Sequence, residues 1–238
     1  QRMLVEMTHD FVEKEMLPHE ETLERTDALP PELAESLKKR AIELGLHACN
    51  LPEEVGGGGL DAVSVMLIEK ELGRTSLALA ECAHRPLNIL ASCEGEQVTQ
   101  FLEPTVRGEK RDCIAMTEPG AGSDLRGMKC KAERVGDDWV INGEKHFISQ
   151  ASVSDYCVLF AATGSEAFED QTVKAPRKYI SAFLVDFSDP GVEVAPGYKN
   201  VSHRGYTNNI LRFDNVRIPQ WRIMGPEGDG FRLVNQWL

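Results

Sequence analysis

The spacing of apolar residues changes near Gly108, and this change constrains the fold more than any other feature of the sequence. Before Gly108 apolar side chains recur at helical spacing, as in Leu4, Met7 and Phe11. After it, residues 128–133 alternate between apolar and polar side chains, which is the period of a strand. The sequence therefore predicts an α+β protein, with an N-terminal all-α domain followed by an antiparallel β-barrel or sandwich domain.

The same patterns predict the positions of individual elements. We expect helices over 4–16, 31–44, 63–72, 76–90 and 97–106, and strands at 112–116, 128–133, 139–142, 156–162, 180–186 and 210–216. The segment 135–139 and the pair Asn142-Gly143 carry hairpin turn signals. We predict a helical domain over 1–111, a β domain over 112–226, and the start of a further, truncated helical domain over 227–238.

Composition and charge exclude several classes of protein. The chain of 238 residues has a net charge of −12 and no cluster of Lys and Arg, which argues against a nucleic-acid partner. No apolar run approaches the roughly 18 residues that a membrane span requires. The six cysteines form no CxxC pair, so we expect reduced, buried thiols, an intracellular compartment and no metal site.

The segment "MTEPGAGSDLRGMK", residues 116–129, places three glycines just after a predicted strand. A dinucleotide-binding fingerprint would need glycine where Leu125 stands, and a phosphate-binding P-loop would need lysine where Met128 stands. Two interpretations remain open. Either the segment is a wide turn between strands that uses Pro and Gly only for their conformations, or it is built to hold a ligand.

The ligand-binding interpretation rests on the chemistry of small residues. Gly120 and Gly122 let backbone N–H groups converge and let a flat or anionic ligand approach without meeting a Cβ atom. Thr117 and Ser123 add hydroxyl groups. Such a loop suits a cofactor that has both a polar ring edge and a phosphate.

A second segment, "GEKHFISQ" at residues 143–150, has the residues to complete such a site. Phe147 could cover the face of a ring, and Ser149 could donate a hydrogen bond to a ring heteroatom. The alternative is that Phe147 belongs to the core and that Ser149 is an ordinary hydroxyl at the end of a strand.

Taken together and in this order, these segments resemble the acyl-CoA dehydrogenase family of flavoproteins. The resemblance covers essentially the whole chain, and it includes the segments "LPEEVGGGGLD", "WVINGEKHFIS", "FDNVRIP" and "GPEGDGF". The segment 116–129 resembles the most characteristic flavin motif of the family. Trp is usual in the family where this chain has Phe147, and Thr is usual where it has Ser149; both differences keep an aromatic face and a hydroxyl.

The resemblance implies FAD as the cofactor and an acyl-CoA thioester as the substrate. Ser123 and the pair Arg177 and Lys178 are expected to meet the CoA moiety, although a solvated basic pair is the alternative for the latter two. The residues expected to contact the cofactor are Ile114, Ala115, Met116, Thr117, Gly122, Ser123, Phe147, Ile148 and Ser149.

The reaction implied is α,β-dehydrogenation of the thioester to a trans-2-enoyl-CoA, in fatty acid or amino acid catabolism, with an electron-transferring flavoprotein as acceptor. A homotetramer or homodimer in a bacterial cytoplasm or mitochondrial matrix is implied too. Relatives carry the catalytic Glu beyond the position of Leu238, so no catalytic residue is expected in this chain. We expect structural roles for Glu118, Asp124 and Glu144.

Other functions remain possible on the same fold. Related flavoproteins act as acyl-CoA oxidases, nitroalkane oxidases or flavin monooxygenases. A protein that holds a CoA ester without catalysis is a further alternative.

Overall fold

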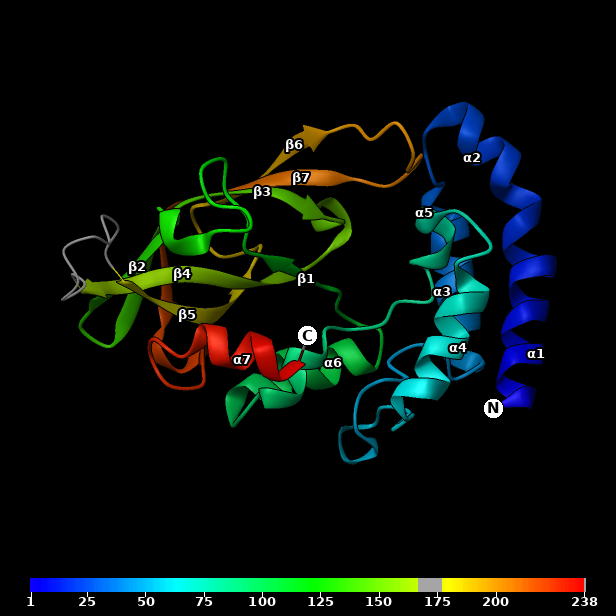
Figure 1. The fold of residues 1–238 in the computed structure, drawn as a ribbon, viewed down its shortest axis with the longest axis horizontal. Coiled ribbons are helices and arrows are strands. Elements are labelled where there is room, and N and C mark those ends of the chain that lie inside the picture. Colours follow the sequence, from blue (N-terminus) through cyan, green and yellow to red (C-terminus); the bar gives the residue numbers. More distant parts are fainter. Residues whose placement is uncertain (167–176, 238) are drawn as a thin grey trace. The chain divides into compact units, whose positions relative to one another are not determined.

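A computed structural model describes residues 1–166 and 177–237, and within them the chain forms two compact units. The first, which we call the helical unit, comprises residues 1–91, 102–109 and 199–206. The second, the sheet unit, comprises residues 92–101, 110–198 and 207–238. This order of helices and then strands confirms the predicted α+β class (Figure 1).

The helical part of the chain begins with one long helical stretch that changes its winding. Helix α1 (Arg2–Phe11) continues into a π-helical turn (Val12–Met16), a 3₁₀ turn (Leu17–His19) and α2 (Glu20–Thr26). The other elements are α3 (Pro31–Glu43), a 3₁₀ turn (Glu53–Val55), α4 (Ala62–Leu72), α5 (Leu77–Ala80), a 3₁₀ segment (Asn88–Ser92), a π-helical turn (Val98–Leu102) and α6 (Glu103–Val106).

The apolar faces of α1, α3, α4 and α5 form one core. Phe11, Leu37 and Ile68 are buried together, as their helical spacing in the sequence predicts. Asp61 caps α4 by accepting a hydrogen bond of 2.9 Å from the backbone N–H of Ser64, which explains why the helix begins there.

The helix expected over 76–90 is mostly absent. The chain forms only α5 and a 3₁₀ segment in this region. Pro86 lacks a backbone N–H and disfavours helical geometry in the residue before it, so the apolar pattern cannot continue as one helix. The expectation of one helix was wrong because Pro86 interrupts a stretch whose apolar spacing favours a helix.

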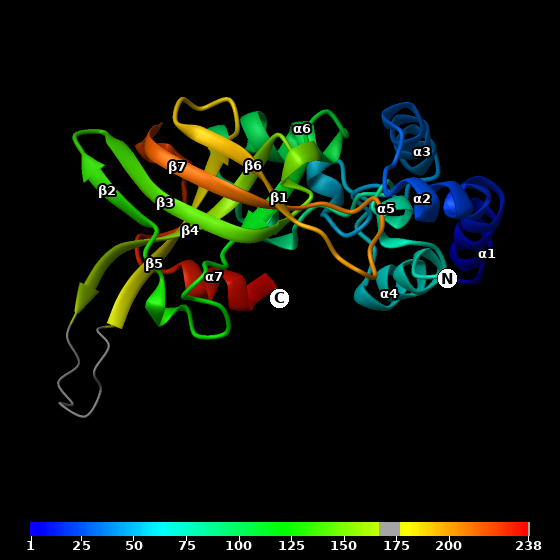
Figure 2. The same cartoon turned by 90° about the horizontal axis from the view of Figure 1, so that it is seen from above.

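The described residues of the sheet unit form one mixed sheet of eight strands: β1 (Asp112–Ala115), β2 (Lys131–Val135), β3 (Asp138–Ser149), β4 (Tyr156–Glu166), β5 (Arg177–Asp186), β6 (Val192–Tyr198), β7 (Asn208–Pro219) and β8 (Ile223–Met224). The strand order is β6-β7-β3-β2-β4-β5-β8, and β1 pairs with β4 outside this path (Figure 2). The sheet does not close into a barrel among the described residues, so of the two predicted forms the sandwich fits. The pairings β1–β4 and β2–β4 are parallel rather than antiparallel. Helix α7 (Gly230–Trp237) follows β8, in agreement with the helix expected near Gly230.

Two local predictions in the sheet were wrong. Asn142 and Gly143 lie inside β3, where the register with β7 shifts at a bulge, and they do not form a hairpin turn. A Cβ atom on Gly143 would lie 2.6 Å from Cα of Cys130, so this glycine is required by a close approach of two backbones. Strand β6 is not among the strands expected from the sequence; it contains Pro196 and is an edge strand, where proline is tolerated.

The residues 92–101 are helical in part, yet they group with the sheet unit. The side-chain amide of Gln97 donates hydrogen bonds of 2.7 Å to the carbonyl groups of Trp221 and Ile223. The domain boundaries drawn from the sequence remain a prediction.

The inner side of the sheet is an apolar core that includes three cysteines. Cys113, Cys130 and Cys157 are buried among residues such as Trp139 and Phe183. Burial raises the pKa of the Cys113 thiol to about 12 and that of Cys130 to about 11. All six cysteines of the chain are free and buried, which confirms the expectation of reduced thiols. Among the described residues, no helix has the length and apolar character needed to cross a membrane.

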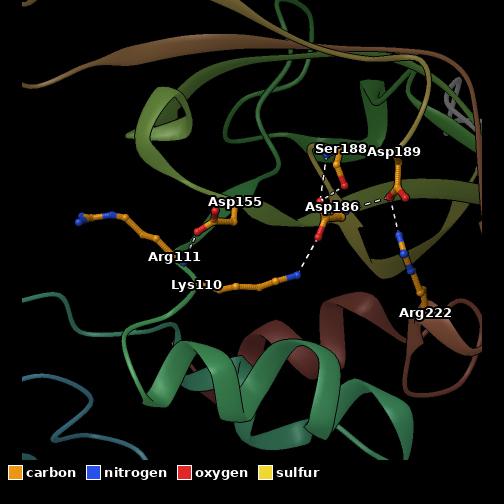
Figure 3. A network of polar contacts seen from close by, with 7 residues as sticks. All are labelled: Lys110, Arg111, Asp155, Asp186, Ser188, Asp189 and Arg222. Atoms are coloured by element: carbon orange, nitrogen blue, oxygen red, sulfur yellow. Dashed lines mark hydrogen bonds and ion pairs between the residues drawn. The ribbon is translucent and has the colours of Figure 1, made fainter.

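A polar network joins the start of β1 to the end of β5 (Figure 3). Asp186 accepts a hydrogen bond of 2.8 Å from Nζ of Lys110 and bonds of 3.0 and 2.6 Å from the backbone N–H and hydroxyl of Ser188. Burial by itself raises the pKa of Asp186, but the bonds from Lys110 and Ser188 outweigh it and hold the pKa below the ordinary 3.8. Nearby, Asp189 forms an ion pair with Arg222.

We predict that Asp186→Asn lowers the free energy of unfolding by about 1–3 kcal/mol at pH 7, because a charge-assisted bond to Lys110 is lost. Since the pKa of Asp186 is lowered by folding, its contribution is present above about pH 4 and is lost as the pH falls further. Urea unfolding of both proteins at pH 7 and pH 3 should show the difference shrinking at the lower pH. Glu133→Gln, in the exposed pair with Lys131, is the control and should change stability by less than about 1 kcal/mol. An equal loss at both pH values would contradict the assigned role of the carboxylate.

Candidate functional site

The segment 116–129, which we call the glycine segment, follows β1 after Ala115 and folds back through a tight turn. Glu118 and Ala121 exchange two backbone hydrogen bonds of 2.9 and 3.1 Å, which close the turn around Pro119 and Gly120. A short 3₁₀ turn (Leu125–Gly127) then returns the chain to the sheet. These two hydrogen bonds therefore close the base of the exposed turn.

The glycines of this segment differ in what the fold requires of them. A Cβ atom on Gly127 would lie 2.7 Å from the carbonyl oxygen of Gly120, so the fold itself requires glycine at 127. A Cβ atom on Gly120 or Gly122 would meet nothing within 4 Å, and neither residue has a positive φ. Conformation and packing within this chain therefore do not explain glycine at 120 and 122, whereas close approach by a ligand would.

A buried ion pair lies beneath the segment. Nζ of Lys145, whose side chain is fully buried, lies 2.7 Å from Oε1 of Glu118. The Glu118 carboxylate also accepts hydrogen bonds from the backbone N–H groups of Lys129, at 2.6 Å, and Cys130, at 3.0 Å. Both oxygens of Glu118 are thus engaged, which fits the expected structural role and leaves this carboxylate poorly suited to remove a proton from a substrate.

The same lysine joins the two predicted segments. Nζ of Lys145 donates a hydrogen bond of 3.0 Å to the carbonyl oxygen of Met116, and the backbone N–H of His146 donates one of 2.8 Å to the carbonyl oxygen of Thr117. The segments around 116–118 and 145–149 therefore lie side by side, although Glu118 and Lys145 are 27 positions apart in the sequence.

Phe147 is held in an unusual backbone conformation at the surface. It lies at a shift in register between Lys145 and Ile148 on β3, with φ of 58° and 55% of its surface exposed. A positive φ is strained for a bulky residue, and exposure of an aromatic ring adds to the cost. Phe147 is therefore not a core residue, and more than half of it is exposed.

Ser149 follows Phe147 by two residues and has a polar neighbour that the sequence did not reveal. Its hydroxyl donates a weak hydrogen bond of 3.4 Å to Oδ1 of Asn208, the first residue of β7. Tyr198, the last residue of β6, stacks on Phe147 with ring centroids 4.3 Å apart. Neither Asn208 nor Tyr198 stands in a recognisable motif, so only the strand pairing brings them to the site.

The remaining predicted residues divide into three groups. Ala115 and Ile148 are buried in the core, so only their backbone atoms are available to a ligand, while Ile114 is half-buried. Ser123 is exposed on the glycine segment. Arg177 and Lys178 begin β5, and their side chains fall outside the part of the chain that the structure describes.

A hollow of about 780 Å³ opens beside the glycine segment, on the surface formed by β3, β6 and β7. Its lining consists of residues 118–120, 129, 143–144, 191–193 and 212–214. Thr117, Phe147 and Ser149 do not line it. The hollow is lined by residues 118–120 of the glycine segment, but it is separate from the predicted site at Thr117, Phe147 and Ser149.

We predict that Lys145→Met lowers the free energy of unfolding by about 3–5 kcal/mol, because it leaves the buried Glu118 carboxylate without its counter-ion. The double variant Lys145→Met/Glu118→Gln should recover part of this loss in thermal and urea unfolding. Lys131→Met, which breaks the exposed pair with Glu133, is the matched control and should cost less than about 1 kcal/mol. Similar losses in Lys145→Met and Lys131→Met would show that the pair does not hold the site together.

Comparisons with known proteins agree with this geometry. Residues 1–109 match the family "Acyl-CoA dehydrogenase, N-terminal domain", and residues 113–216 match "Acyl-CoA dehydrogenase, middle domain". The human mitochondrial short-chain specific acyl-CoA dehydrogenase is 34% identical over 242 residues, which cover 100% of this chain and 56% of the relative.

Solved structures give the same result. A probable acyl-CoA dehydrogenase from Mycobacterium abscessus matches with a TM-score of 0.85 and 28% identity, over 99% of this chain and 61% of that one. An acyl-CoA dehydrogenase from Bacillus anthracis, solved in complex with FAD, matches with a TM-score of 0.83 and 29% identity, over 98% of this chain and 39% of that one. The chain thus spans little more than half the length of the human relative. On the two matched domains and the shared fold, the chain belongs to the acyl-CoA dehydrogenase family.

Proposed function

We propose that this chain forms the flavin-binding part of an FAD-dependent acyl-CoA dehydrogenase. The observation that carries the proposal is a pair of hydrogen bonds, from Lys145 to the carbonyl of Met116 and from His146 to the carbonyl of Thr117. These bonds join the segments 116–129 and 143–150 into one surface. Exposed Phe147 lies on this surface, and Gly120 and Gly122 leave open space on the adjoining segment.

The residue types at the candidate site, which are hydrogen-bonding groups, an aromatic ring and small residues, are suited to binding FAD. We propose that the Met116–Thr117 backbone and the Ser149 hydroxyl hydrogen-bond the polar edge of the ring, and that Phe147 covers a ring face. Gly122 and Ser123 are proposed to approach the phosphates and the substrate's pantetheine arm, because small residues let backbone N–H groups reach an anion. FAD, when bound, supplies the acceptor for the two electrons removed from the substrate.

The proposed reaction converts an acyl-CoA thioester to the trans-2-enoyl-CoA and passes the electrons to an electron-transferring flavoprotein. Arg177 and Lys178 are proposed to meet the CoA moiety. We do not assign the base that removes the α proton to Glu118, because this carboxylate is committed to the ion pair with Lys145. We propose structural roles for Asp124 and Glu144 as well. Homo-oligomeric assembly and a place in fatty acid or amino acid catabolism belong to the same proposal.

Two measurements test the proposal. The chain should quench the fluorescence of added FAD in a saturable titration. The corresponding full-length protein, loaded with FAD, should then lose its visible absorbance in anaerobic titration with acyl-CoA esters from short to long chains. Failure of the full-length protein to take up FAD would overturn the proposal, and rapid reoxidation by air alone would favour an oxidase or monooxygenase over a dehydrogenase.

We predict that Gly122→Val weakens FAD binding about tenfold or more while the melting temperature changes little. The side chain enters space that is empty in this chain, so it obstructs the ligand without straining the fold. Gly127→Ala is the contrasting control, because its Cβ atom would strike the Gly120 carbonyl and should lower the melting temperature. FAD titration and thermal unfolding on both variants check the prediction. Unchanged FAD affinity in Gly122→Val would show that the cofactor lies elsewhere.

A further inference from the structure

One row of residues crosses the sheet at the end of the candidate site. Ser149 on β3 pairs with Asn208 on β7, and Asn208 pairs with Tyr198 on β6. A Cβ atom on Gly197 would lie only 1.9 Å from the carbonyl oxygen of Asn208, so glycine is required for β6 to lie this close to β7. This close approach fixes the backbone of Tyr198 beside the row that contains Ser149.

The side chain of Tyr198 is held at two points. Its ring stacks on Phe147 with centroids 4.3 Å apart and planes inclined by only 18°. Its hydroxyl shares a hydrogen bond of 2.8 Å with Nδ1 of His146, a residue that is 9% exposed. A ring anchored at its hydroxyl and stacked on its neighbour has little rotational freedom.

The stacking matters because it gives the exposed ring of Phe147 a neighbour to pack against. Its left-handed backbone turns the ring outward at a break in the pairing of β3 with β7, where 55% of the residue is exposed. An exposed ring in such a position would otherwise be free to change rotamer, and a mobile ring makes a poor surface for a ligand. Tyr198 covers one face of Phe147 and leaves the rest of the ring for contact.

We propose that Tyr198 is a positioning residue that holds the Phe147 ring ready for the flavin, and that it acts through Phe147 rather than by reacting with substrate. This inference rests on the proposed function. It assigns to the end of β6, which carries no flavin motif, a role in cofactor affinity: the stacked pair is preorganised, so binding need not order the ring. His146 contributes by anchoring the Tyr198 hydroxyl.

The test compares Tyr198→Ala with Tyr198→Phe in the 238-residue chain. Tyr198 is 42% exposed at the end of an edge strand, so both variants should fold. We expect Tyr198→Ala to weaken FAD binding about three- to tenfold, the range that one aromatic pair supplies, and Tyr198→Phe to stay within about twofold of the parent. Val135→Ala removes an apolar side chain of similar exposure at the β2–β3 hairpin and should leave FAD affinity unchanged.

Three results would overturn the inference. Unchanged affinity in Tyr198→Ala would show that the stack does not serve the site. Tighter binding in Tyr198→Ala would show that the tyrosine occupies the place of the flavin ring. Equal weakening in Tyr198→Ala and Tyr198→Phe would assign the effect to the hydrogen bond with His146 and not to the ring.

A measurement without cofactor separates this inference from the proposed function. Amide hydrogen exchange over residues 145–149 should be faster in Tyr198→Ala than in the parent chain and in Val135→Ala. If the parent chain fails to bind FAD but exchange still accelerates in Tyr198→Ala, the proposed function fails and the positioning of Phe147 by Tyr198 is supported. If the parent chain binds FAD and neither affinity nor exchange responds to Tyr198→Ala, only the positioning role of Tyr198 is contradicted. In the loaded chain, the visible absorption bands of the flavin should broaden in Tyr198→Ala, a change that lost stability alone would not produce.

Discussion

The buried ion pair between Lys145 and Glu118 is the interaction on which the site depends. An ammonium and a carboxylate can be removed from water only if each finds other partners, and here those partners are backbone groups at two places in the chain, Met116 and Lys129–Cys130. The need to satisfy both charges therefore draws the carbonyl of Met116 and the amides of Lys129 and Cys130 to one point. The geometry of the site is set by charges that lie beneath it.

That constraint separates a fixed base from an open surface. Gly127 and Gly143 are glycines because neighbouring backbones leave no room for a Cβ atom, whereas Gly120 and Gly122 face open space. Phe147 likewise keeps a strained positive φ although more than half of it is exposed. The strained residue Phe147 and the glycines at 120 and 122, which the fold does not require, lie where the two segments meet. This arrangement is expected where rigid elements support a binding site.

Much of the architecture could be predicted because it follows from local patterns. The apolar stripes that predict α3 and α4, and the alternation that predicts β2, reflect burial on one face of a helix or strand. The failures have local causes too. Pro86 interrupts the stretch 76–90, whose apolar spacing favours one helix. Strand β6 contains Pro196 and lies at an edge, and Asn142-Gly143 forms part of a bulge rather than a turn.

The sequence by itself determined the change from helix to strand, the two candidate segments 116–129 and 143–150, and the family resemblance, because these are properties of neighbouring residues. Only the tertiary structure decided which distant residues meet: Lys145 with Glu118 across 27 positions, and Ser149 with Asn208 across 59. It also decided that Tyr198 stacks on Phe147. Strand register and bulges decide these contacts, and register depends on packing over a whole sheet, which no short stretch of sequence contains.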